Sequence, residues 1–128
     1  MNEFGGVDDL YRDFILDHFR HPRNAGTLDR PTATFEDNNP LCGDRIRMDV
    51  SVADDRVADI RFAGRGCAIS QASASLLTEA VKGKTVAEVR QMSDESVLEN
   101  LGIPISAARL KCALLGIKVL KQALATLS

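Results

Sequence analysis

Three cysteines and one aspartate are the residues of this sequence whose types and surroundings could bind a metal ion. Cys42 and Asp44 flank Gly43 in the segment NPLCGD, and residues two apart in an extended chain point to the same side. Gly43 lets the backbone pass close to a bound group. The pattern predicts a two-ligand unit, and the alternative is a turn in which Asp44 accepts hydrogen bonds from backbone amides.

The other two cysteines are expected at the beginnings of helices. Cys67 follows the glycine-rich segment GRG, where unpaired amides and the helix dipole favour a thiolate. Cys112 stands beside Arg109 and Lys111, whose charges favour a thiolate if the sulfur is partly exposed. Burial among apolar neighbours would instead make Cys112 a core residue.

Three thiols and one carboxylate could fill the tetrahedral shell that Zn(II) prefers, and the same set could hold an iron-sulfur cluster. A permanently held cluster normally has four thiolate ligands, so one carboxylate indicates a site that can release its cargo. The histidines are not expected to take part. His18 falls on the apolar side of a predicted helix and His21 precedes Pro22, which favours packing or capping.

The composition indicates one globular domain spanning residues 1–128. The chain has 45% hydrophobic and 27% charged residues with a net charge of -2, which argues against disorder and against nucleic-acid binding. The odd count of three cysteines argues against a disulfide scaffold. There is no apolar run of about 18 residues and no basic leader, so we expect a cytoplasmic protein without a membrane segment.

The N-terminal part predicts one helix and a connection. Asp8 can cap a helix that ends before Pro22. The connection over residues 21–39 could contain a short strand around residues 33–36. The helix should bury an apolar face made of Leu10, Tyr11, Phe14, Ile15 and Phe19.

A β-hairpin is expected next, with one face packed and the other solvated. The turn is at Asp54 and Asp55. The residues expected on the packed face are Ile46, Met48, Val50 and Val52 in the first strand and Ala58, Ile60 and Phe62 in the second, whereas Arg45, Arg47, Asp49 and Ser51 should face water.

The rest of the chain predicts helices. A stripe of Ile69, Ala72, Leu76 and Ala80 ends at residues 82–84, and short helices over 85–92 and 94–101 have caps at Thr85 and Ser93. A long helix from near Ser106 should bury Leu110, Leu114, Ile117, Leu120 and Leu124, leaving Arg109, Lys118 and Lys121 to water. These elements predict an α+β fold in the order helix-strands-helices, with about three antiparallel strands covered on one face by helices.

Four segments in this order resemble the U-type iron-sulfur cluster assembly family, which includes IscU, SufU and the N-terminal domain of NifU. They are YRDFILDHFRHPRN, NPLCGD, GRGCAIS with SASLLTEAVKGK, and RLKC. The resemblance spans nearly the whole chain. It implies a cytosolic scaffold on which a 2Fe-2S cluster is assembled and then passed to apo-proteins, with a cysteine desulfurase as sulfur donor. It also implies that Cys42, Asp44, Cys67 and Cys112 form the site.

The chain combines features of two branches of that family. Lys111 stands where IscU proteins have histidine, as is usual in SufU, and is expected to support the site through its charge. The insertion that SufU proteins carry before the last helix is missing. The segment ISAAR at residues 105–109 replaces the chaperone-recognition segment LPPVK of IscU, which argues against an Hsp70-type chaperone partner.

Three functions therefore stay open. The first is a scaffold, which is not itself an enzyme and takes persulfide on Cys112. The second is a zinc-bound acceptor similar to SufU that takes persulfide on Cys42 and relays it. The third is a structural zinc protein. The missing insertion favours the scaffold and Cys112.

Overall fold

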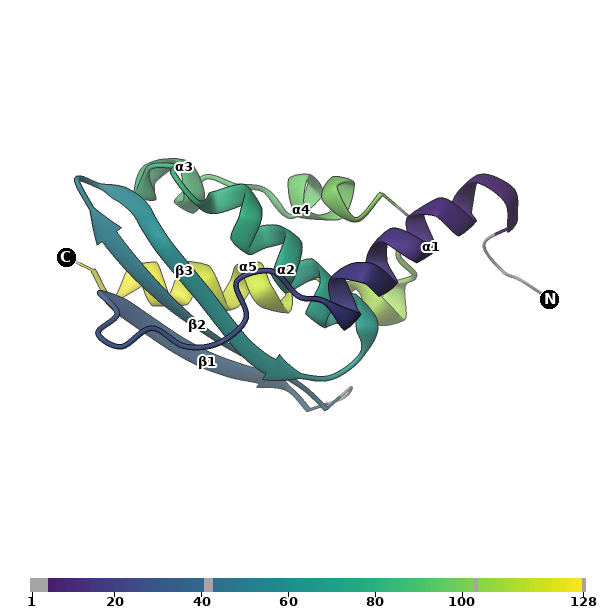
Figure 1. The fold of residues 1–128 in the computed structure, drawn as a ribbon, viewed down its shortest axis with the longest axis horizontal. Helices are drawn as coiled ribbons and strands as arrows, with labels where there is room; N and C mark the ends of the chain where they lie inside the picture. The colour runs from purple at the N-terminus through teal and green to yellow at the C-terminus, as the bar shows by residue number, and fades with distance from the viewer. Residues whose placement is uncertain (1–4, 41–42, 103, 128) are drawn as a thin grey trace.

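The computed structural model of the chain describes residues 5–40, 43–102 and 104–127. Its elements follow the predicted order of helix, strands and helices. Three antiparallel strands form a sheet in the order β1-β2-β3, and the long helices α2 and α5 lie on one face of it (Figure 1). The predicted α+β arrangement is confirmed. None of the helices described is long and apolar enough to span a bilayer.

The hairpin that leads toward the site is confirmed. β1 (Ala33–Asn39) pairs with β2 (Asp44–Ala53), which pairs with β3 (Arg56–Arg65). Asp54 and Asp55 both have positive φ angles, 53° and 62°, as the two-residue turn of a tight hairpin requires. The strand expected around residues 33–36 therefore exists and continues to Asn39.

The alternation in the second hairpin strand was predicted wrongly at its start. Val57 is buried and Ala58 is exposed, the reverse of the expectation. Ser51 pairs with Asp59 and Val52 pairs with Val57, so Ala58 has no counterpart and forms a bulge. The extra residue reverses which side chains face the helices.

Asp49 is the second departure in the sheet, because it was expected in water and is 1% exposed. Its carboxylate accepts hydrogen bonds from Thr34 Oγ1 at 2.6 Å, from the Leu28 amide at 3.0 Å and from Arg47 Nε at 2.9 Å. Burial acts to raise the pKa of Asp49, but these hydrogen bonds outweigh it and the pKa is lowered. Through the Leu28 amide, the carboxylate thus fixes the connection over residues 21–32 against the sheet.

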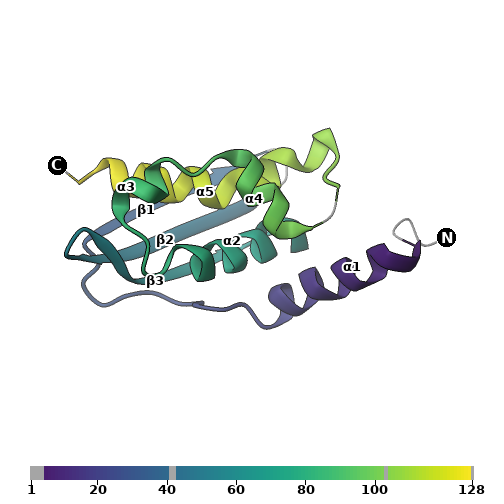
Figure 2. The same ribbon diagram turned by 90° about the horizontal axis from the view of Figure 1, so that it is seen from above.

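Helix α1 (Gly5–Arg20) ends before Pro22 as predicted and begins slightly earlier than expected. Its buried side is narrower than the sequence suggests, because Ile15 and His18 are buried whereas Phe14 and Phe19 are 42% and 39% exposed. The side chains of Leu10 and Tyr11 lie outside the described residues. The physical reason is that α1 packs on α2 and extends past its end, so only a thin stripe is covered (Figure 2).

Helix α2 (Ala68–Val81) is confirmed, but it is buried on more than the predicted stripe. It lies among β3, α1, α4 and α5. Three of the four residues in the predicted apolar stripe are only half-buried. By contrast, four side chains that carry a hydroxyl group are buried in this helix. The four are Ser70, Ser73, Ser75 and Thr78.

The last helices agree with the sequence. α3 (Val86–Arg90) and α4 (Asp94–Leu101) are capped by Thr85 and Ser93 as predicted. A short helix η1 (Ala107–Arg109) leads into α5 (Leu110–Ala125), which packs on β1 and β2. Ile117, Leu120 and Leu124 are buried, and Leu110 and Leu114 are half-buried. Arg109 and Lys118 are exposed, but Lys121 is half-buried and donates to the Met92 carbonyl at 2.6 Å.

Candidate metal centre

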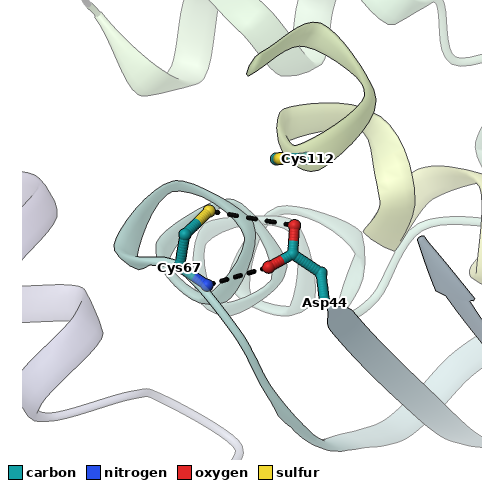
Figure 3. Close-up of side chains that lie close together, drawn as sticks. All are labelled: Asp44, Cys67 and Cys112. Atoms are coloured by element: carbon teal, nitrogen blue, oxygen red, sulfur yellow. Dashed lines mark hydrogen bonds between the residues drawn. The ribbon is translucent and has the colours of Figure 1, made fainter. Parts of the chain in front are cut away.

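Three of the four predicted ligands converge at one end of the sheet. The ligand atoms of Asp44, Cys67 and Cys112 lie within 4.8 Å of one another (Figure 3). They come from the start of β2, the N-cap of α2 and the first turn of α5. Cys42, the fourth predicted ligand, lies outside the described residues.

Asp44 is fully buried and is oriented by the residue that carries one of the sulfurs. Its Oδ1 accepts a hydrogen bond from the Cys67 backbone amide at 2.8 Å, and its Oδ2 lies 3.8 Å from Cys67 Sγ. The backbone-acceptor role is therefore seen at Oδ1, and Oδ2 stays available for the ligand role that the sequence presented as the alternative.

The glycines before Cys67 make this contact possible. Gly66 has a φ of +143°, and a Cβ at this position would lie 2.1 Å from Asp44 Oδ1. A Cβ at Gly64 would lie 2.1 Å from the Arg45 carbonyl oxygen. Both positions therefore exclude a side chain, so that β3 can turn into α2 directly over the carboxylate. Cys67 is half-buried at the helix start, as its sequence context indicated.

Cys112 is fully buried in the first turn of α5. The two cations beside it, Arg109 and Lys111, are exposed. In the described part of the chain, the hydrogen-bond donors to the Asp44 carboxylate come from Cys67 and not from Lys111. A supporting role of Lys111 through its charge stays a prediction.

Neither histidine belongs to this group of donors, and the packing role predicted for His18 agrees with the geometry. His18 is buried between α1 and α2, with Nδ1 2.8 Å from Ser75 Oγ. Burial, which desolvates the imidazolium, lowers the pKa of His18 below its ordinary value of 6.5, and the nearby charge of Arg23 adds to this effect. His21 is exposed.

The donors fit a metal ion by their chemistry. Two sulfurs and a carboxylate oxygen match the ligands that Zn(II) takes, and three converging donors leave one place of a tetrahedral shell for a fourth. Asp44 and Cys112 are fully buried, so packing restricts the orientation of the carboxylate and of the Cys112 sulfur before any ion binds. The fold and the site together define a small α+β domain with a candidate metal-binding site.

Comparison with known proteins identifies the family of this domain. The model of the NifU-like N-terminal domain matches residues 10–128, and the chain belongs to that family. It is 40% identical over 142 aligned residues to the "Zinc-dependent sulfurtransferase SufU" of Bacillus subtilis, covering 98% of this chain and 96% of the relative. It is 35% identical over 115 residues to the "Iron-sulfur cluster assembly scaffold protein IscU 1" of Archaeoglobus fulgidus, covering 90% and 74%.

A solved structure shows the same fold. It is described as a hypothetical protein, is 33% identical to this chain and superimposes with a TM-score of 0.78 over 93% of this chain and 99% of its own. The alignment with the Bacillus protein is longer than the 128 residues of this chain, so that relative carries residues that this chain lacks. The difference in length has the direction expected from the missing insertion, whose position before the last helix stays a prediction.

One hydrogen bond next to Cys112 was not predicted from the sequence. Ser73, on α2, donates a hydrogen bond to the carbonyl of Ala113, the residue after Cys112. The available signal was the run of serines after Cys67, since serine is not a favoured residue in a helix interior. Such serines often have a partner on a neighbouring element.

Proposed function

We propose that this chain is a scaffold for iron-sulfur cluster assembly. It accepts sulfur from a cysteine desulfurase, holds a 2Fe-2S cluster as its cargo and passes the cluster to apo-proteins. The observation that carries the proposal is the mixed donor set, in which a buried carboxylate is oriented toward two cysteine sulfurs. One carboxylate among thiolates is the feature expected of a site that releases what it binds.

The proposed site consists of Asp44, Cys67 and Cys112 together with Cys42. Cys42 is included because it lies two residues before Asp44 in the segment that enters β2. Lys111 is proposed to support the site through its charge. We also propose that residues 1–128 act as one domain, since the family match covers most of the chain and the site draws on three distant segments.

Zinc suits the same residues when no cluster is present. A zinc ion bound there would supply positive charge that keeps the cysteines as thiolates near neutral pH. Two features of the protein would favour zinc binding at this site. The Cys67 amide orients Asp44, and burial of Asp44 and Cys112 shields their donor atoms from competing water.

The scaffold function is tested by reconstitution. Metal-free protein is incubated anaerobically with ferrous iron, L-cysteine, a catalytic amount of a cysteine desulfurase and a dithiol reductant, which supplies the electrons that ferrous iron does not provide for reducing persulfide sulfur to sulfide, and the 2Fe-2S absorption and circular dichroism bands are recorded. Transfer to an apo-ferredoxin then follows. About one cluster per one or two chains that moves to the ferredoxin is the expected result. Failure to form any cluster from a protein that binds zinc would contradict the scaffold function.

A second candidate is a zinc-bound sulfur acceptor that relays persulfide. The observations that favour it are the 40% identity to the Bacillus protein named a zinc-dependent sulfurtransferase and the lysine directly before Cys112. The relay and the scaffold differ in whether they require iron. A relay should stimulate cysteine turnover by the desulfurase with zinc bound and without iron, whereas a scaffold requires iron to complete its product.

The third reading, a purely structural zinc ion, makes a different prediction for metal removal. The main core is built from the sheet, α2, α3, α4 and α5, and its apolar contacts do not depend on the donors. We therefore expect chelation to loosen the site while the hairpin and α5 stay folded. Global unfolding on chelation, seen by circular dichroism, would favour the structural reading instead.

A further inference from the structure

The two helices that supply the sulfurs are joined by a buried hydrogen bond outside the donor set. Ser73 Oγ on α2 donates to the Ala113 carbonyl on α5 at 2.7 Å. Ser73 is 2% exposed and Ala113 is fully buried, so no water competes for the bond. Ser73 follows Cys67 on α2, and Ala113 is adjacent to Cys112 on α5.

The same helices also approach closely through small residues. A Cβ built at Gly116 would lie 3.5 Å from the Ala74 Cα and 3.5 Å from the Met48 Cε. Small residues let the helices come close, and the hydrophobic driving force itself has no preferred direction. A hydrogen bond has a preferred distance and angle, and therefore fixes the relative position along the helix axes.

We infer that Ser73 is a positioning residue of the metal centre. Its bond to Ala113 holds α5 against α2 at the position that brings the sulfurs of Cys67 and Cys112 within reach of one ion. A shift of about one residue along a helix moves a side chain by about 1.5 Å, whereas a metal site tolerates about 0.5 Å. The inference deepens the proposed function, because it rests on the proposed binding of metal by these cysteines.

The chain offers a matched control on the same helix. Ser75 is also fully buried, but its hydroxyl lies 2.8 Å from His18 Nδ1 and accepts from the Arg23 amide at 2.9 Å, so it serves the α1 side of α2. Replacing Ser75 removes buried hydrogen bonds without touching the contact between the cysteine-bearing helices. A general loss of stability and a loss of sulfur positioning can thus be separated.

The test compares Ser73→Ala and Ser75→Ala with the parent protein. Zinc affinity is measured by competition with a chromophoric chelator, and cobalt(II) loading reports ligand geometry through its visible absorption bands. Urea titration of each metal-free variant measures folding stability. If a variant is too unstable, all the measurements are made in sucrose, which favours the compact state.

Ser73→Ala is expected to lower zinc affinity by about tenfold and to change the cobalt spectrum, as loss of groups that orient metal ligands commonly does. Ser75→Ala should lower stability at least as much but keep zinc affinity within about twofold of the parent. The inference is overturned if Ser73→Ala keeps the parent affinity and cobalt spectrum, or if both variants lose affinity equally. If the parent itself binds neither zinc nor cobalt, the proposed metal centre fails, and the inference fails with it.

Discussion

Asp44 contacts Cys67 through both of its carboxylate oxygens. Oδ1 accepts a hydrogen bond from the Cys67 backbone nitrogen at 2.8 Å, and Oδ2 lies 3.8 Å from the Cys67 sulfur. The backbone of one proposed ligand therefore sets the direction of another. The hydrogen bond uses Oδ1 and leaves Oδ2 facing the sulfur. A change at either residue should alter the donor set as a whole, which leads to the first prediction.

Asp44→Ala should make a reconstituted 2Fe-2S cluster longer-lived and slower to transfer. The carboxylate is the ligand least suited to iron in a thiolate set and opens the route by which an acceptor thiol enters. We expect cluster loss to a chelator to slow by about tenfold, or about 1.4 kcal/mol of activation free energy. The decay of visible circular dichroism with time measures this rate.

Asp44→Asn is the control for this prediction. Asparagine can keep an oxygen acceptor for the Cys67 amide but removes the carboxylate charge. A long-lived cluster in both variants would assign the lability to the carboxylate rather than to the local backbone. If the cluster of Asp44→Ala decays and transfers as fast as the parent cluster, Asp44 is not the labile ligand.

Gly66→Ala should abolish tight zinc binding. The added Cβ would lie 2.1 Å from Asp44 Oδ1, and the φ of +143° strains any residue with a side chain. Strain of this kind alone costs about 1–3 kcal/mol. The clash should also displace the carboxylate, so zinc affinity measured by chelator competition should fall by well over about tenfold.

Gly26→Ala is the matched control, because Gly26 has a similar φ of +126° and nothing lies within 4 Å of its built Cβ. The Gly26→Ala variant therefore has similar backbone strain but makes no contact with Asp44. We expect it to lower the free energy of unfolding and to leave zinc affinity unchanged. Equal loss of zinc affinity in the two variants would show that the contact between Gly66 and Asp44 has no special role.

His18 should make the metal-free protein less stable as the pH falls below about 6.5. Burial lowers the pKa of His18 in the folded state, with Arg23 adding to the effect and Glu79 and Asp17 opposing it. The folded state therefore binds fewer protons than the unfolded chain in this range, so stability is full above the unfolded pKa and falls as the pH drops toward the folded one.

Urea titrations of the metal-free protein between about pH 7.5 and pH 5.5 measure this dependence. His18→Gln removes the titrating group and keeps a polar side chain near Ser75. The difference between parent and variant isolates the contribution of His18 from that of the carboxylates. The explanation would be wrong if parent and variant lost stability by the same amount over this interval.

The sequence predicted much of the site because its local signals are strong. Alternation from Asp44 onward placed that residue at a strand entrance, and the glycines before Cys67 placed the sulfur at a helix start. Each of these positions depends on neighbours within a few residues. No local signal placed the donors near one another, and only their chemistry and the family resemblance implied that they converge. In the structure, Asp44, Cys67 and Cys112 do lie together.

The wrong predictions depend on pairing and packing between elements, which the pattern within one element does not show. Phe14 was expected to be buried, but α1 packs on α2 over a narrow stripe. Asp49 was expected in water, but Leu28 in the connection over residues 21–32 and Thr34 in β1 both donate hydrogen bonds to it. Ala58 was expected inside, but a one-residue bulge changes the side that it faces. Periodicity describes one element at a time and does not show which neighbour covers it.

The position of the persulfide after one desulfurase turnover should distinguish the two transfer functions. Cys112 is the predicted acceptor of a scaffold, yet its side chain is fully buried. The start of α5 offers a way to expose it. Among the residues that the structure describes, no side chain caps η1 or α5, and η1 is exposed. Because η1 is exposed, we expect it to open together with the first turn of α5, against the Ser73–Ala113 hydrogen bond, and to make Cys112 reachable.

Sulfur is therefore expected on Cys112, at a rate limited by opening of the first turn of α5. The protein, in one sample metal-free and in another loaded with zinc, is mixed with a desulfurase and L-cysteine for a single turnover, alkylated and mapped by peptide mass spectrometry. Hydrogen exchange at the start of α5 gives the opening rate for comparison. Label on Cys42 alone would assign the chain to the sulfur-relay class. A chain with no label on Cys42, Cys67 or Cys112 would exclude both transfer functions and leave the structural zinc reading.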